Sequence, residues 1–124
     1  MGYRSQVVLA VGKELMPQFL VTLAKSPDTR AMCFSHTDRT EKDYDGEGGM
    51  LFYWSSCKWY DSYEEVRAIE DFLDWAECEV FGEAPDNVNG DECFKFVRAG
   101  ENDDDNVCRG HGFQDVYISR SIEF

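Results

Sequence analysis

The stretch SYEEVRAIEDFLDWAE, residues 62–77, decides the fold, because it holds the clearest helix of the chain. Ser62 and Glu65 match a capping box, in which the serine caps the helix and the glutamate reaches back to its N–H. Apolar residues then recur at helical spacing: they are Val66, Ile69, Phe72, Leu73 and Ala76. The pattern predicts an amphipathic helix with one apolar stripe and acids over the rest of its surface.

Segments on both sides of this helix are rich in β-branched and aromatic residues, which is typical of strands. The predicted strands are residues 3–11, 50–60, 92–98 and 113–124, with a shorter one at 30–37 that pairs with 50–60. Charged and glycine-rich segments separate them and are predicted to be loops: these are residues 38–49, 81–90 and 100–112.

A second helix is predicted over residues 13–25, where Leu15, Phe19 and Leu20 belong to one apolar stripe. It ends near Pro27, because the residue before a proline avoids the helical conformation. The order β-α-β-β-α-β-β predicts an α+β fold with one mostly antiparallel sheet of four to five strands and two helices on one face. Residues 1–124 are expected to form a single domain.

The acidic residues are concentrated in one part of the chain. The 124 residues include 25 acids and 12 bases, a net charge of −13. Residues 61–106 contain sixteen of the acids and three bases, also a net −13, whereas the segments on either side are each neutral. Such a stretch attracts basic partners and argues against direct binding of DNA or RNA, which depends on Lys and Arg. The plainer alternative is that the acidity only keeps the protein soluble.

The acids and aromatics of this region are the candidate partner-binding residues. Acids near the C-terminal end of the predicted helix, such as Glu77, oppose the helix dipole, so helix stability alone does not explain them. We expect aromatic side chains beside the acidic face to act as anchors for a partner protein. The full set is Glu64, Glu70, Asp71, Asp74, Glu77, Asp103, Asp104 and Asp105, with Trp59 and Tyr63 as the anchors. A narrower version of this hypothesis is nucleic-acid mimicry, in which the carboxylates occupy a groove meant for phosphates.

Two Cys-x-x-His pairs leave a zinc site open as an alternative. Cys33 and His36 form one pair, and Cys108 and His111 form the other. These four ligands suit a tetrahedral site if the two segments meet in space, although the spacing is not that of a zinc finger. Otherwise we expect the five cysteines to be reduced thiols of a cytoplasmic protein, because the sequence shows no secretory signal. No apolar run approaches the roughly 20 residues of a membrane span.

The sequence contains no recognised catalytic motif. It lacks Gly-x-Ser-x-Gly, a phosphate-binding glycine loop and His-Glu-x-x-His. We therefore expect neither catalysis nor a cofactor, with an unrecognised enzyme as the remaining alternative.

Short motifs at both ends and in the middle resemble small accessory proteins of tailed bacteriophages. They are the opening MGYRS, the segment KWYDSY at residues 58–63 before the acidic helix, and VYISR at residues 116–120. The resemblance implies expression in a bacterial cytoplasm and binding to a host protein that is then modulated or inhibited, such as a defence complex of the CRISPR type. It implies no catalytic residues, and the oligomeric state stays open.

Overall fold

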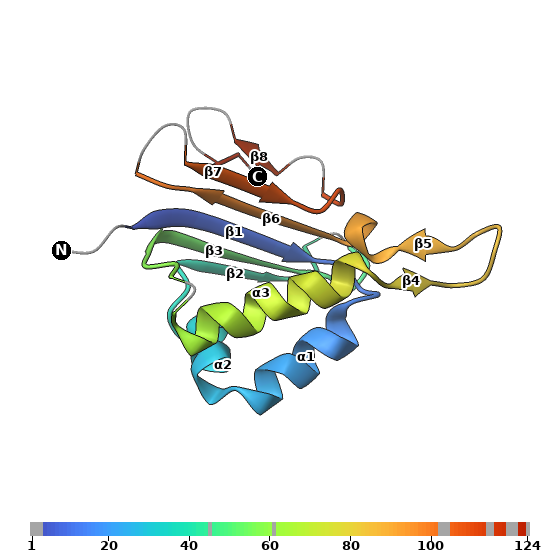
Figure 1. Cartoon of the computed structure of the whole chain (residues 1–124), viewed down its shortest axis with the longest axis horizontal. Coiled ribbons are helices and arrows are strands. Elements are labelled where there is room, and N and C mark those ends of the chain that lie inside the picture. Colours follow the sequence, from blue (N-terminus) through green and yellow to red (C-terminus); the bar gives the residue numbers. More distant parts are fainter. Residues whose placement is uncertain are drawn as a thin grey trace.

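The chain forms a five-stranded antiparallel sheet with three helices on one face (Figure 1). The computed structural model describes residues 4–44, 46–60, 62–101, 105–113, 116–118 and 122–123. The sheet has the order β2-β3-β1-β6-β7. Its strands are β1 (Ser5–Val11), β2 (Arg39–Lys42), β3 (Met50–Cys57), β6 (Phe94–Ala99) and β7 (Asn106–Arg109). The α+β fold is therefore confirmed.

The helices are α1 (Met16–Lys25), α2 (Pro27–Phe34) and α3 (Glu64–Glu77), one more than the two predicted. Two short hairpins lie outside the main sheet. One consists of β4 (Val80–Phe81) and β5 (Val88–Asn89), followed by a 3₁₀ turn at Gly90–Glu92. The other consists of β8 (Tyr117–Ile118) and β9 (Ile122–Glu123). Among the described residues, no helix is long and apolar enough to cross a bilayer.

Strand β1 is the centre of the sheet. It pairs with β3 on one side and with β6 on the other, so that Val8 faces Tyr53 and Val97. Both faces of β1 are covered, and residues 7–11 are fully buried. This explains the near-continuous apolar run VVLAV, which is typical of a strand buried on both sides.

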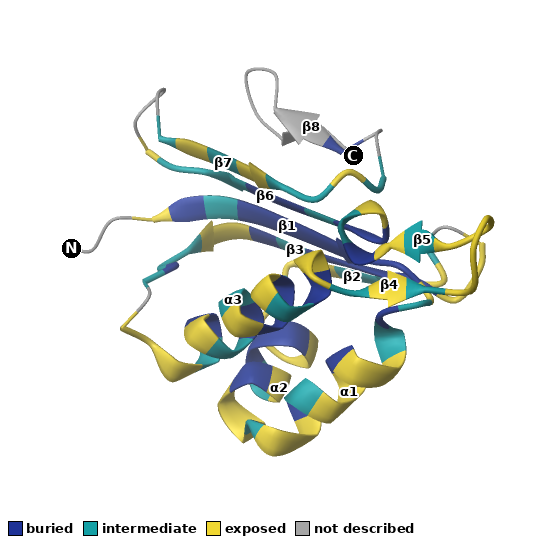
Figure 2. Ribbon diagram, turned by 45° about the vertical axis from the view of Figure 1, so that its right-hand side comes forward, coloured by how far each residue is buried: buried dark blue, intermediate teal, exposed yellow. Residues whose placement is uncertain are grey.

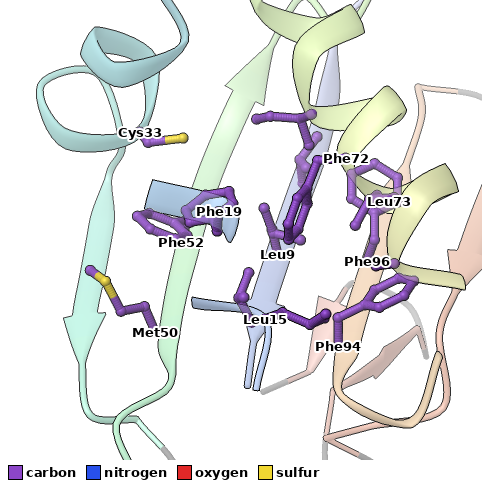
Figure 3. Packing of buried hydrophobic residues seen from close by; sticks show 14 of the residues in the cluster. Leu9, Leu15, Phe19, Cys33, Met50, Phe52, Phe72, Leu73, Phe94 and Phe96 are labelled. Atoms are coloured by element: carbon purple, nitrogen blue, oxygen red, sulfur yellow. The ribbon is translucent and has the colours of Figure 1, made fainter. Parts of the chain in front are cut away.

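The main core lies between the helices and the sheet, and five phenylalanine rings pack in it among aliphatic side chains (Figure 3). The ring of Phe19 from α1 lies 5.5 Å from that of Phe52 in β3 and 5.1 Å from that of Phe72 in α3. The predicted stripe of α3 is buried as expected. The stripe of α1 is narrower than predicted, since Leu20 is half exposed.

A smaller apolar cluster lies on the opposite face of the sheet. It contains Val8, Ala10, Leu51, Val97 and Val116. Strands β8 and β9 contact β6, and β9 also contacts β1. The C-terminal part of the chain therefore lies against the face that the helices leave open.

Residues 30–37 do not form the predicted strand, because most of them belong to α2. Ser26 caps this helix by accepting a hydrogen bond from the Thr29 N–H, and Pro27 occupies its first turn, where no N–H is needed. The loop prediction was wrong for three short segments. Residues 38–49 contain β2, residues 81–90 contain the β4–β5 hairpin apart from Val80, and residues 100–112 contain β7.

The predicted capping box of α3 was also wrong. The residue that caps the helix is Tyr63, which has an extended backbone and gives no side-chain capping bond. The Tyr63 N–H donates to the Tyr60 carbonyl in a turn, so Ser62 lies in this turn and the helix begins after it.

Candidate functional site: the two flanks of helix α3

Five of the six acids of α3 lie on two flanks of the helix, and the sixth, Glu65, lines a hollow beside α2. Glu70, Asp74 and Glu77 recur at i, i+4 and i+7, which places them on one side. Glu64 and Asp71 are also seven residues apart and lie on another side. The first flank faces β7, and Asp71 of the second flank lies beside α1.

Arg109 of β7 holds all three acids of the first flank. Its Nε donates to Glu77 Oε1 at 2.9 Å, Nη1 donates to Glu70 Oε2 at 2.7 Å, and Nη2 donates to Asp74 Oδ1 at 2.7 Å. Burial by itself lowers the pKa of Arg109. The hydrogen bonds to Glu77 and Asp74 and the charges of Glu77 and Glu70 raise the pKa by more than burial lowers it, so its net value is above the ordinary one. These three predicted partner-binding residues therefore have an internal role, in which they fasten β7 to α3.

Trp59 is not the surface anchor that the sequence predicted. Its side chain is buried, and its Nε1 donates to Glu70 Oε1 at 3.0 Å. Its ring packs 5.7 Å from that of Trp54 and 5.4 Å from that of Phe96. Trp59 is thus a core residue, whose one polar atom is satisfied by the Arg109 cluster.

Tyr63 does lie at the surface, with 37% of its area exposed. Its ring is 5.3 Å from that of Tyr60. Among the three predicted aspartates, Asp105 accepts hydrogen bonds from Arg98 at 3.1 and 3.3 Å. Asp103 and Asp104 lie outside the described residues.

Among the exposed acids of α3 and the β4–β5 hairpin, four have no such partners: Glu64 and Asp71 on α3, and Glu83 and Asp86 between β4 and β5. In the described part of the chain, no hydrogen bond or ion pair engages their side chains. The β4–β5 hairpin projects beyond the C-terminal end of α3, and its surface is largely exposed (Figures 1 and 2). We call these four residues the acidic ridge. Arg67 is the sole base within the α3 sequence.

A groove runs between α1 and α3 beside the acidic ridge and encloses about 340 Å³. Two aromatic residues of α3, Phe72 and Trp75, contribute to its lining, with ring centroids 5.9 Å apart. The remaining lining residues are Ala68 and Asp71 of α3, Gln18, Thr22 and Lys25 of α1, and Ser26. Asp71 of the second flank therefore lies in a groove that also has aromatic lining residues.

The two Cys-x-x-His pairs do not meet. Thr40 of β2 donates to the Cys33 carbonyl, which places Cys33 at one edge of the sheet, whereas Cys108 lies on β7 at the other edge. Across the described ranges, no three metal-binding side chains form a group that could hold an ion. Burial also raises the pKa of the Cys33 thiol to about 12, which disfavours the thiolate that zinc needs.

A wider hollow of about 600 Å³ lies where α2, β3 and the start of α3 meet. Its lining includes Arg4, His36, Cys57 and Lys58. Burial raises the pKa of the Cys57 thiol, and within the described structure no hydrogen bond joins its sulfur to His36. A raised pKa disfavours the thiolate that a nucleophilic cysteine needs.

The sequence analysis did not single out four of the site residues, which are Trp75, Glu83, Asp86 and Arg109. Trp75 had a usable signal, because it follows Asp71 by four residues and so shares its side of the helix. Arg109 had none, since its role depends on the pairing of β7 with β6.

No protein-family model matches the chain, and no curated protein or solved structure matches it either.

Proposed function

We propose that the chain is a non-catalytic binding protein that docks through its acidic ridge on the basic surface of another protein. One observation supports the proposal: Arg109 binds some of the acids of α3 and leaves others available to a partner protein. Those facing β7 are bound by Arg109, whereas Glu64 and Asp71 are exposed and have no partner among the described residues.

The dimensions of the ridge suit a protein interface. The fourteen residues of α3 span about 21 Å, and the β4–β5 hairpin extends beyond them. A standard interface buries roughly 800 Å² on each partner, which is compatible with a helix face of this length and an adjoining hairpin. The excess negative charge along this stretch speeds encounter with a basic surface and disfavours acidic ones.

The resemblance to phage accessory proteins supports a narrower form of the proposal. The partner is then a protein of the bacterial cytoplasm, such as a component of a CRISPR-type defence complex, and docking modulates or inhibits it. Mimicry of nucleic acid is the mode of inhibition if the occupied surface normally binds phosphates.

Capture of the partner from bacterial lysate tests the proposal. The ridge variant combines Glu64→Lys and Glu83→Lys, and the matched control combines Asp28→Lys and Glu47→Lys. Glu64 and Asp28 both lie in the first turn of a helix, and Glu83 and Glu47 are both exposed outside helices and strands. The two variants therefore change the net charge and the helix dipoles equally.

We expect the ridge variant to recover at least tenfold less of the partner than the wild type, and the control to recover as much as the wild type. Equal recovery by the two variants would contradict the proposal. Repeating the capture with excess duplex DNA tests mimicry: DNA should displace the partner if they share a surface. A partner that resists DNA leaves docking intact and excludes mimicry.

A further inference from the structure

The groove between α1 and α3 combines an aromatic lining with a carboxylate. Phe72 is buried, and Trp75 is partly buried and packs against the core beside it. Asp71 is exposed, and its side chain has no hydrogen bond or ion pair within the described part of the chain. The groove shares Asp71 with the acidic ridge, so an inference about what binds in the groove rests on the proposed function.

Lys25, the cation among the described lining residues, lies toward the end of the groove that is farther from Trp75. Thr29, in the first turn of α2, donates to the Glu65 carbonyl. Because α2 begins two residues after α1 ends, the C-terminal end of α1 also lies near the first turn of α3. The two helices therefore run antiparallel, as Figure 1 shows. Lys25 is near this end, whereas Gln18, seven residues or about 10 Å earlier along α1, lies toward Trp75. The end with the aromatic rings is thus the more negative one.

We infer that this groove receives an arginine side chain of the basic partner protein. A guanidinium group is planar and stacks on aromatic rings, and it can donate two parallel hydrogen bonds to a carboxylate. In the groove, Asp71 supplies the carboxylate and Trp75 the ring, while Phe72 offers apolar surface to the methylene stem. A lysine ammonium neither stacks as a plane nor binds the carboxylate with two bonds, so the groove selects arginine.

The test uses two capped peptides of equal charge, acetyl-hexaarginine amide and acetyl-hexalysine amide, titrated into the full chain. Trp75 reports binding, because Trp54 and Trp59 are buried and the chain contains three tryptophans. Three variants each make the net charge one unit less negative: Asp71→Asn removes the carboxylate, Ala68→Arg fills the groove, and Glu47→Gln is the distant control. Each retains Trp75, and circular dichroism checks that each is folded.

We expect hexaarginine to bind at least threefold more tightly than hexalysine and to change the tryptophan emission. Asp71→Asn and Ala68→Arg should each weaken hexaarginine at least fivefold, whereas Glu47→Gln should change its affinity less than twofold. Lys25→Gln should tighten binding, because it removes the competing cation.

Equal affinities for the two peptides, or variants that weaken hexaarginine no more than Glu47→Gln does, would overturn the inference, as would a failure of both peptides to bind. None of these results affects the capture experiment above, which leaves Asp71 and the groove unaltered. Conversely, loss of the proposed function would appear there as equal recovery by the ridge variant and its control.

Discussion

Arg109 decides which acids of α3 are available to a partner. It is the best-protected member of its cluster, with 18% of its side chain exposed against 69% for Asp74. Removing it leaves three carboxylates on neighbouring turns of one helix without a counter-ion, and like charges at this spacing repel. The strand that carries Arg109 is also an edge strand, so the cluster helps to hold that edge in place.

The variant Arg109→Met keeps most of the apolar stem and removes the charge. We expect the free energy of unfolding, measured with urea, to fall by roughly 1–2 kcal/mol. This loss lies between the loss expected for breaking an exposed ion pair and that for breaking a buried one. The loss should shrink in 0.5 M NaCl, which screens the repulsion among the acids. Arg67→Met, on the exposed side of the same helix, should change stability by less than about 0.5 kcal/mol. An equal loss in both variants would show that the cluster has no special role.

Cys33 makes stability depend on pH in the alkaline range. Its pKa is raised by burial from 9.0 to about 12, so the folded state keeps the proton that the unfolded state releases above pH 9. This contribution is complete below pH 9 and is lost as the pH rises toward 12. Between pH 8 and 10.5 the loss should reach about 2 kcal/mol.

Urea unfolding at these two pH values measures the effect. Cys33→Ala lacks this thiol, so its stability should fall less between the two pH values than that of the wild type. Parallel falls would contradict the assignment, because they would show that other groups cause the alkaline loss.

At the scale of elements, Gly90 joins the β4–β5 hairpin to α3. Its N–H donates to the Glu79 carbonyl at 2.7 Å, and a Cβ placed on it would lie 1.9 Å from the Ala76 carbonyl oxygen. The end of the helix and the hairpin can approach this closely because residue 90 has no side chain. The direction in which the hairpin projects, and with it the position of Glu83 and Asp86, therefore depends on one glycine.

We expect Gly90→Ala to cost about 3 kcal/mol of stability, because backbone must move to admit the methyl group. Gly46→Ala is the comparison: its surroundings are open and only its positive φ of 75° is strained. It should cost about 1 kcal/mol. Thermal or urea unfolding of both variants measures the difference, and equal costs would mean that the contact with Ala76 is relieved without strain.

The elements that the sequence predicted well are those whose own residues carry the pattern. The apolar stripe of α3 and the buried run of β1 were correctly placed, because the spacing of apolar residues indicates whether one or both faces of an element are buried. Residues 30–37 were assigned to a strand although Ser26 and Pro27 form a good helix start, because these two residues were interpreted as the end of α1. Strand β7 was missed because Asn106–Arg109 is short and polar and gains its structure from pairing with β6.

The candidate site was predictable as a region but not as a set of residues. The charge count located the acids in residues 61–106. It did not separate Glu70 from Asp71, which are neighbours in the chain and face different surroundings. The surroundings of Glu70 and Asp71 differ because β7 lies beside one side of α3 and α1 beside another. Such contacts between segments distant in the chain cannot be predicted from the spacing of residues within one segment. Trp59 illustrates the same limit, since its burial depends on Trp54 and Phe96.

For the whole molecule, the segregation of charge predicts that salt stabilises the fold. Residues 61–106 carry a net charge of −13, and exposed carboxylates of one sign repel one another in the compact state. If this repulsion costs about 1 kcal/mol, raising NaCl from 20 to 300 mM should raise Tm by about 4 °C. The ridge variant with Glu64→Lys and Glu83→Lys should respond less than the control with Asp28→Lys and Glu47→Lys. Identical responses would show that total charge matters and its location does not.

The central position of β1 has a consequence for synthesis on the ribosome. Its first partner, β3, begins at Met50, but its second partner, β6, begins only at Phe94. At about 5–20 residues per second, the ribosome needs roughly 4–17 s to travel from Val11 to Phe94. During that time one edge of β1, whose residues 7–11 are fully buried in the folded protein, has no neighbour in the nascent chain. Translation that stalls before residue 94 therefore leaves an open, aggregation-prone edge, and the sheet closes around β1 only when most of the chain has been made.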